Sequence, residues 1–361
     1  MSPRVLYFGT YERGYPRNAQ VISCLRGAGV EVVERHVGVW EHRRHKWASG
    51  PAAAARLAVA EARLLAAARA RGERFDAVIV GYPGHFDLPA ARWAARGGPV
   101  IFNPLVSLHE TLVEDRRRFA PGSLAARLLL GIDRLALRRA DLVVADTDQN
   151  ARHLVALGGI PRQRVETCFV GAEERLFRPT WRTPESFTAL FVGKLIPLHG
   201  VETILAAATL APELSFRVVG SGQLDAVLRD RSPNVDWVEW VDYERLPQEL
   251  ERAGCALGVF GTSAKAARVV PNKAFQALAC GVPLVTADTP AARELLRDGE
   301  SALFVPAGDP GALAAAVRRL AADPALGRRL GEGGHAAYLE HASERVLGER
   351  WRGLVERLAA R

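Results

Sequence analysis

The sequence predicts an α/β protein of two consecutive domains that each alternate strands with helices. Short apolar stretches are repeatedly followed by a glycine- or proline-marked loop and a helix-like stretch, the order typical of a parallel sheet. A chain of 361 residues exceeds what one hydrophobic core usually organises. The alternation lapses at residues 171–179 and then restarts. This lapse predicts a linker, with one βα domain on each side of it.

The first half opens with a βα unit. Apolar residues 4–8 predict a buried strand, residues 9–18 a loop, and residues 19–26 a helix that Gly27 ends. Further strands are predicted at 30–34, 77–81, 100–103, 142–145 and 164–170, with helices at 51–71, 86–96, 123–139 and 149–157. Because parallel strands end at one edge of their sheet, we expect ligands at the loops that follow these strands.

The second half repeats the pattern. Strands are predicted at 187–192, 216–219, 235–240, 255–260 and 303–305, with helices at 201–210, 246–252 and from Pro310. Residues 261–288 predict a loop, a short helix, a tight turn and a buried strand. The final helix is expected to dock onto another part of the protein, because one stripe of it holds Leu347, Trp351, Leu354 and Leu358. We place the domains at residues 1–172 and 173–344 and the final helix at 345–361.

The composition indicates a globular protein with an anionic partner. The net charge is +8 and the pI is about 9.7, which favours a nucleotide, a nucleic acid or a lipid surface. No apolar run reaches the roughly 18 residues that cross a bilayer, and the first residues are typical of a strand rather than a signal peptide. Neither metal-site nor disulfide spacing is found among Cys24, Cys168, Cys255 and Cys280. We therefore expect a cytoplasmic protein without a metal site.

The most specific local feature is a cluster of cations around a predicted helix start in the second domain. Lys265 and Lys273 flank this start, Asn272 is a suitable N-cap, and Gly281 suits the left-handed position after the helix. The unpaired N–H groups and the positive dipole of a helix start bind anions. Lys273 and Gln276 are three residues apart and share a face. The cluster predicts an anion site, and the alternative is a solvated helix face.

Two glycine-containing turns follow predicted strands of the same domain. In Gly193-Lys194 the glycine admits a ligand to the backbone and the lysine offers charge to a phosphate. The turn Gly220-Ser221-Gly222 suits a nucleotide, although it lacks the full Gly-x-Gly-x-x-Gly pattern. Either could equally be a plain turn between a strand and a helix.

Four side chains near predicted strand ends of the first domain are candidate acceptor-side groups: His85, His109, Glu110 and Asp115. A histidine or carboxylate in such a place could act as a general base toward a hydroxyl acceptor. We prefer His109 for that role. The alternative is structural, because a lone histidine is more often a hydrogen-bonded part of the fold.

Arginines and large apolar residues are interleaved in two segments of the first domain. One holds residues 116–119 and the helix with Arg127, Arg134, Arg138 and Arg139, and the other is residues 40–47, with two tryptophans. This combination is typical of segments that lie on an anionic membrane, so it predicts peripheral membrane contact. The alternative is a solvated basic face. We recognise no nucleic-acid-binding module and expect no nucleic-acid partner.

Four motifs of the second domain occur together in an order found in one known family. Phe191-Val-Gly-Lys-Leu-Ile-Pro-Leu-His-Gly200 is similar to that family's Phe-Val-Gly-Arg-Leu…Lys-Gly. Residues 218–222, 277–283 and 305–310 also match, as does the junction at 170–179. As a set they resemble the GT-B glycosyltransferases of the large retaining family (family 4 type). The resemblance implies two Rossmann-like domains that face across a cleft, with the final helix packing back on the first domain.

The resemblance implies a nucleotide-diphosphate sugar donor in the second domain and a hydroxyl or amine acceptor in the first. Lys194 falls where the family has a phosphate-binding arginine, and His199 where a second phosphate-binding lysine is common. Arg268 and Gln276 replace the family's paired glutamates. Gln276 can still hydrogen-bond a ribose hydroxyl, and Arg268 can pair with a phosphate or a sugar carboxylate. The remaining predicted donor-binding residues are Gly9, Gly193, Gly220, Ser221, Val241, Lys265 and Asn272.

By resemblance the reaction is transfer with retention through same-face attack, without a metal or other cofactor. The predicted catalytic residues are His109, Arg268 and Lys273, and a lysine would neutralise the leaving diphosphate. Three alternatives stay open. Inversion would need a first-domain base, for which His109 is the first choice. A catalytically silent GT-B protein could bind a ligand or partner, because both glutamates are replaced. A nucleotide-sugar epimerase would need paired carboxylates that we cannot place.

Overall fold

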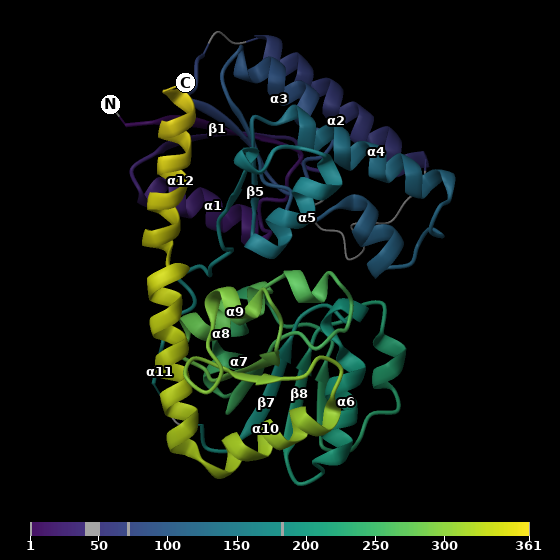
Figure 1. Cartoon of the computed structure of the whole chain (residues 1–361), viewed down its shortest axis with the longest axis vertical. Coiled ribbons are helices and arrows are strands. Elements are labelled where there is room, and N and C mark those ends of the chain that lie inside the picture. Colours follow the sequence, from purple (N-terminus) through teal and green to yellow (C-terminus); the bar gives the residue numbers. More distant parts are fainter. Residues whose placement is uncertain (1, 40–50, 71–72, 182–183, 361) are drawn as a thin grey trace. The chain divides into compact units, whose positions relative to one another are not determined.

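The computed structural model describes residues 2–39, 51–70, 73–181 and 184–360 (Figure 1). The predicted tryptophan-containing segment 40–47 lies outside the described residues. The chain divides into two compact units, Met1–Val170 with Glu344–Arg361, and Gly171–Ser343. Each unit contains a six-stranded parallel sheet with flanking helices, so the predicted α/β class is confirmed.

The first unit is built on a sheet in the order β2-β1-β3-β4-β5-β6. Its strands are β1 (Arg4–Gly9), β2 (Glu31–His36), β3 (Ala77–Val80), β4 (Val100–Phe102), β5 (Leu142–Ala145) and β6 (Val165–Thr167). Its helices are α1 (Pro16–Gly27), α2 (Pro51–Ala70), α3 (Leu88–Ala95), α4 (Leu124–Arg139), α5 (Asp148–Gly158) and α12 (Glu344–Ala359). The central strands are apolar throughout because helices cover both faces of a parallel sheet.

One face of this sheet carries α1 and α12, which pack side by side (Figure 1). Gly348 allows the close approach of the two helices, because a Cβ there would come within 2.5 Å of the Cys24 carbonyl oxygen. Trp351 and Leu354 of α12 are buried in the same apolar cluster as Val21 of α1. The last helix of the chain is therefore part of the first unit's core.

The second unit has the sheet order β12-β11-β10-β7-β8-β9. Its strands are β7 (Thr188–Val192), β8 (Ser215–Val219), β9 (Val235–Val238), β10 (Cys255–Leu257), β11 (Leu284–Ala287) and β12 (Leu303–Val305). Its helices are α6 (Val201–Leu210), α7 (Leu246–Glu251), α8 (Asn272–Ala279), α9 (Ala292–Leu295), α10 (Pro310–Ala322) and α11 (Pro324–His341). The order reverses between β7 and β10, and in open α/β sheets such a switch point is where ligands bind.

Two details of the predicted cation-rich helix are settled by the backbone. The N-cap of α8 is Pro271, with an extended backbone and no side-chain cap, so the prediction of Asn272 as N-cap is wrong by one residue. Asn272 is instead the first helical residue. Gly281 has φ +69° just after α8, which confirms the predicted left-handed position. Helix α11 and the π-helical turn Glu110–Asp115 were not predicted.

No helix within the described ranges combines the length and the apolar composition needed to cross a bilayer.

Candidate functional site

The exit loops of β7 and β8 run against each other in the second unit. The Gly193 N–H donates to the Val219 carbonyl at 2.9 Å. Gly193 and Gly220 have φ values of +148° and +141°, a backbone region that residues with a Cβ atom rarely adopt. A Cβ on Gly220 would lie only 1.9 Å from the Gly193 carbonyl oxygen. This backbone contact therefore requires a glycine at position 220.

The exit loop of β7 also meets the exit loop of β10, across the switch point. Phe260 N–H donates to the His199 carbonyl at 3.1 Å. Gly200 precedes α6 with φ +67°, and a Cβ there would be 2.5 Å from the Phe260 carbonyl carbon. Three strand exits thus converge on the few residues between Gly193 and Gly200.

Lys273 reaches from the first turn of α8 to this convergence. Its Nζ lies 3.5 Å from the centroid of the Phe191 ring. A Cβ on Gly193 would come within 2.9 Å of the same Nζ atom and within 3.4 Å of the His199 ring. Within the described part of the chain this buried Nζ has no hydrogen-bond partner. Lys273, Gly193 and His199 therefore form one cluster, although 80 residues separate the first two in the sequence.

Burial determines the protonation of Lys273. Removing an ammonium from water disfavours the charged form, so burial lowers the pKa of Lys273 well below its usual value. The Phe191 ring attracts the ammonium, and a desolvated contact of this kind is worth about 2 kcal/mol. This is less than the cost of burying a charge that lacks an ionic partner. A phosphate that arrived beside Gly193 would supply that partner.

The His199 ring is oriented by its own loop. Its Nδ1 lies 2.6 Å from the Lys194 carbonyl oxygen. A carbonyl oxygen only accepts hydrogen bonds, so Nδ1 carries the hydrogen. The Nε2 atom of a neutral ring is then an acceptor, whereas that of a protonated ring is a donor. His199 can therefore donate to a phosphate only after it takes up a proton.

Gln276 lies one turn beyond Lys273 and is buried. Its Nε2 is 3.4 Å from the hydroxyl of Tyr243, in the loop after β9. Burial raises the pKa of this Tyr243 hydroxyl, so it stays a neutral donor. Tyr243 was missed as a site residue. Its position two residues after Val241, at a strand exit, was the available signal.

The remaining predicted donor residues lie on the strand-exit loops of the second unit and at the start of α8. Lys194 is exposed on the β7 exit loop, whereas Lys265 is buried on the β10 exit loop. Arg268 closes the short turn after Lys265, to whose carbonyl its backbone N–H donates at 3.0 Å. The half-buried residues Asn272, Ser221 and Val241 lie at the α8 start and the exits of β8 and β9.

In the first unit, His85 is held between two acceptors. Its Nδ1 is 2.6 Å from the Pro83 carbonyl oxygen, and its Nε2 is 3.3 Å from Asp133 Oδ1. The buried Asp133 carboxylate also accepts from the backbone N–H groups of Leu108 and His109, at 2.9 Å each. These contacts tie three segments together, which favours the structural interpretation of His85.

The three other acceptor-side candidates lie on the π-helical turn or just before it. His109 is mostly buried, with Nδ1 3.6 Å from Glu114 Oε1. Glu110 is buried, and its Oε1 lies 3.9 Å from His153 Nε2. Asp115 is also buried. A π-helical turn is uncommon and is often found at functional sites, so these three remain acceptor-side candidates.

Gly9, predicted to bind donor, ends β1 against a buried carboxylate. A Cβ on Gly9, at φ +130°, would lie 2.0 Å from Asp87 Oδ2. Asp87 accepts from the Thr10 N–H at 2.7 Å and from its hydroxyl at 3.0 Å. Burial, together with a hydrogen bond to Asp87, raises the pKa of Glu61 to about 10. Burial also raises the pKa of Asp87, so this carboxyl pair shares a proton.

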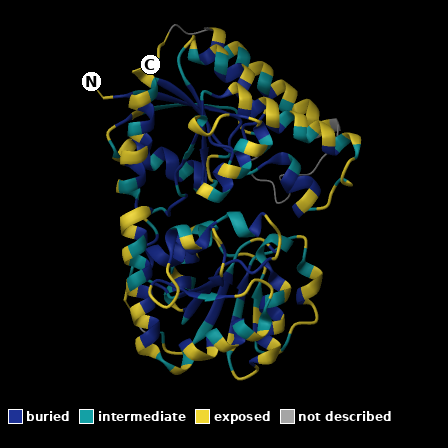
Figure 2. Ribbon diagram, viewed as in Figure 1, coloured by how far each residue is buried: buried dark blue, intermediate teal, exposed yellow. Residues whose placement is uncertain are grey.

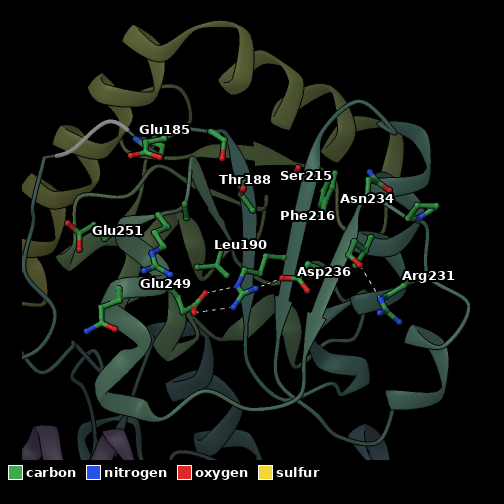
Figure 3. A pocket seen from close by; sticks show the side chains of 18 residues that line it. Glu185, Thr188, Leu190, Ser215, Phe216, Arg231, Asn234, Asp236, Glu249 and Glu251 are labelled. Atoms are coloured by element: carbon green, nitrogen blue, oxygen red, sulfur yellow. Dashed lines mark hydrogen bonds and ion pairs between the residues drawn. The ribbon is translucent and has the colours of Figure 1, made fainter.

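A hollow of about 1090 Å³ lies at the opposite end of the second sheet (Figure 3). It is lined by Thr188, Ser215 and Val235, the first residues of three strands. Arg217, which also lines the hollow, donates to both Glu249 oxygens, at 2.6 and 3.1 Å, and to Asp236. The amino ends of strands and a neutralised arginine do not suit an anionic ligand. The Lys273 cluster is the better candidate.

Comparisons with known proteins identify the family. The family model described as "Glycosyl transferase 4-like domain" matches residues 4–170, and that described as "Glycosyl transferases group 1" matches residues 186–323. The chain is 30% identical over 326 residues to D-inositol 3-phosphate glycosyltransferase 1 from Catenulispora acidiphila, covering 81% of this chain and 75% of that protein. It is 28% identical to the D-inositol 3-phosphate glycosyltransferase from Thermomonospora curvata, with 76% and 71% covered.

Solved structures agree on the architecture. Sucrose-phosphate synthase from Thermosynechococcus elongatus matches with a TM-score of 0.77 at 17% identity, over 100% of both chains. Anabaena HepE in complex with UDP-glucose matches with a TM-score of 0.71 at 15% identity, over 99% of this chain and 100% of that one. The predicted GT-B fold is thus confirmed, and with it an enzyme of the transferase class. The chain belongs to the GT-B glycosyltransferases.

Proposed function

We propose that this glycosyltransferase takes its sugar from a nucleotide-diphosphate donor held at the exit loops of β7 and β10. One observation carries the proposal, the buried Lys273 amine beside Gly193 that lacks a hydrogen-bond partner in the described chain. An unpaired buried amine destabilises the folded state. Proteins keep such unfavourable groups mainly at functional sites, where a bound ligand can pair with them. HepE has been solved in complex with UDP-glucose, with UDP, and with UDP and glucose, so uridine nucleotides are the first donors to test.

The site residues take separate roles in this proposal. Lys273 neutralises the diphosphate as it leaves, with Lys194 and Lys265 on the flanking loops. Gln276 and Tyr243 offer hydrogen bonds to the ribose. Arg268, in the place of the family's sugar-contacting glutamate, pairs with the phosphate or with a carboxylate on the sugar. A guanidinium cannot accept a hydrogen bond from a neutral sugar hydroxyl, so Arg268 favours an acidic group on the donor.

We propose transfer with retention and without a metal. The bond between the anomeric carbon and the β-phosphate oxygen breaks, and the acceptor oxygen bonds to the same face of that carbon. The acceptor proton passes to the leaving phosphate oxygen. Fixed cations stabilise the developing charge of the diphosphate, which is the task that a metal would otherwise perform. If the enzyme inverts, a base must take that proton, and His109 is the candidate.

The acceptor is a hydroxyl or amine compound on the first unit, where His109, Glu110 and Asp115 lie. The relatives named above are called D-inositol 3-phosphate glycosyltransferases, so an inositol phosphate is the first acceptor to test. We also propose peripheral contact with an anionic membrane, for which the arginine-rich α4 is the starting point.

Release of nucleoside diphosphate from a panel of nucleotide sugars tests the proposal, with and without inositol phosphate. We expect release from at least one donor by the wild-type protein, and a fall of about 100-fold or more in Lys273→Met. Arg229→Met, an exposed charge removed from the same unit, is the matched control and should keep full activity. If no nucleotide sugar is turned over and none raises the melting temperature, the donor proposal is wrong.

A further inference from the structure

We propose that helix α4 is a membrane-docking surface, which inserts a stripe of leucines into an anionic bilayer and places arginines at the lipid headgroups. The inference deepens the membrane contact proposed above and names the surface that makes it. Vesicle binding is measured without donor or acceptor, so its failure can be told apart from a failure of the proposed transferase reaction.

The leucine stripe consists of Leu124, Leu128 and Leu135, together with Gly131. These positions recur at intervals of four, three and four residues, which places them on one face of a helix. The leucines are 84%, 64% and 51% exposed. Helix α4 buries Ala126, Ala136 and Leu137 on its opposite face. The helix thus has one apolar face in the core and a second one exposed. Figure 2 shows exposed residues along the outer side of this helix.

Arginines border the leucine stripe on both sides. Arg127, Arg134 and Arg138 are spaced by seven and four residues and lie along one border, and Arg139 lies along the other. All four are exposed. The Nε–H groups of Arg134 and Arg138 donate to the carbonyls of Leu157 and Gly158, at 3.1 and 2.7 Å, which fixes their place beside the stripe.

Helix α4 itself places no carboxylate on its outward side. The acidic residue of α4, Asp133, is 1% exposed and accepts hydrogen bonds on the inner side. The outward face of α4 carries leucines and four guanidinium groups, and α4 adds no carboxylate to it. This face complements a bilayer, in which an apolar layer lies beneath anionic headgroups. A second copy of the chain fits less well, because a two-fold interface would bring these arginines against one another.

The neighbouring helix extends the same chemistry. Helix α3 packs beside α4 and carries Trp93, which is 57% exposed. The Arg69 guanidinium of α2 lies 4.8 Å from the centroid of the Trp93 ring. Tryptophan and arginine are common where proteins meet the membrane–water interface. These two side chains are candidates for the edge of the docking surface.

Flotation with lipid vesicles tests the proposal on the full chain. Vesicles of phosphatidylcholine alone are compared with vesicles containing 30% phosphatidylglycerol, at low and high salt. We expect wild-type protein to float with the anionic vesicles at low salt, and to bind at least about tenfold more weakly to the neutral ones. The double variant Leu124→Gln/Leu128→Gln should lose about tenfold or more in affinity, because it removes the apolar part of the contact.

A matched control removes two exposed leucines of the other unit, Leu210→Gln/Leu339→Gln, which are 50% and 47% exposed. This control should bind as the wild type does. The circular dichroism of each variant checks its folding. Three results would overturn the proposal. Wild-type protein would fail to float with vesicles, or the Leu124/Leu128 variant would bind vesicles as tightly as the wild type. In the third, the wild type would form a concentration-dependent dimer and bind no vesicles, and the variant would lose that dimer.

Discussion

Lys273 destabilises the ligand-free protein, because its buried amine lies against Phe191 without an ionic partner. Its pKa is lowered in the folded chain. The unfolded chain has an ordinary lysine pKa near 10.4, so it holds more protons than the folded chain between the lowered pKa and that pH. The destabilisation is greatest at low pH and shrinks as the pH rises toward about 10.4. A bound diphosphate would supply the missing ionic partner and so favour the charged form of the amine.

The variant Lys273→Met separates these two effects. It removes the buried charge and keeps the length of the side chain, so the melting temperature without ligand should rise by a few degrees at pH 7. The stabilisation by nucleoside diphosphate, measured as a further rise in melting temperature, should disappear. Scanning calorimetry with and without UDP gives both numbers. A variant that melts lower than wild type, yet still responds to UDP, contradicts the assigned role.

The Glu61–Asp87 pair makes the first unit less stable as the pH rises. The pKa of Glu61 is about 10 when folded and about 4.3 when unfolded. Between these values the folded chain holds the extra proton, so stability falls as the pH rises. In Glu61→Gln the amide donates to Asp87 and has no such proton to lose. The melting-temperature advantage of this variant should grow by about 3 °C or more between pH 5 and pH 8.5.

Glu73→Gln is the matched control for this pair. Glu73 is an exposed carboxylate of the same unit, 3.7 Å from Arg4 Nη2. Its replacement should produce no advantage that depends on pH in this way. An advantage of Glu61→Gln that is equal at both pH values would show that the two carboxyl groups do not share a proton.

At the scale of elements, two abutting loops shape the donor site. Gly220→Ala would strain a φ of +141° and push a methyl group into the Gly193 carbonyl. We expect a loss of about 2 kcal/mol or more in unfolding free energy, and a much weaker response to UDP.

Gly353→Ala in α12 is the control. A Cβ there meets no described atom within 4 Å, so this variant should gain about 0.5–1 kcal/mol. Equal effects of the two variants would contradict this account.

Most helices and strands could be predicted from the sequence, but few of the contacts between side chains could. The βα order, the strand exits and the Gly281 turn follow from local patterns, and the structure confirms the βα order and the Gly281 turn. The N-cap of α8 was wrong by one residue because Pro271 and Asn272 are both plausible helix starters. The burial of Lys273 against Phe191 was not predictable, because it depends on how α8 packs on the sheet beside β10 and β11. The Glu61–Asp87 pair was missed for the same reason.

For the whole molecule, the final helix makes the first unit discontinuous in sequence. Leu347, Trp351 and Leu354 of α12 complete its core, whereas Gly171–Ser343 is one continuous stretch. A chain that ends at Ser343 should therefore lose the cooperative melting of the first unit. The second unit should keep its own transition and its shift with UDP. Calorimetry of this truncated chain checks both, and an unchanged first transition would rule out the stabilising role of α12.

A crystal structure of the protein with a nucleoside diphosphate tests the central claim most directly. We predict a β-phosphate oxygen at about 3 Å from Lys273 Nζ, beside Gly193 and His199, with the ribose near Gln276. The same structure would show what Arg268 contacts. A diphosphate bound at the amino ends of the strands near Arg217, with the Lys273 amine still unpaired against Phe191, would contradict the proposed donor site.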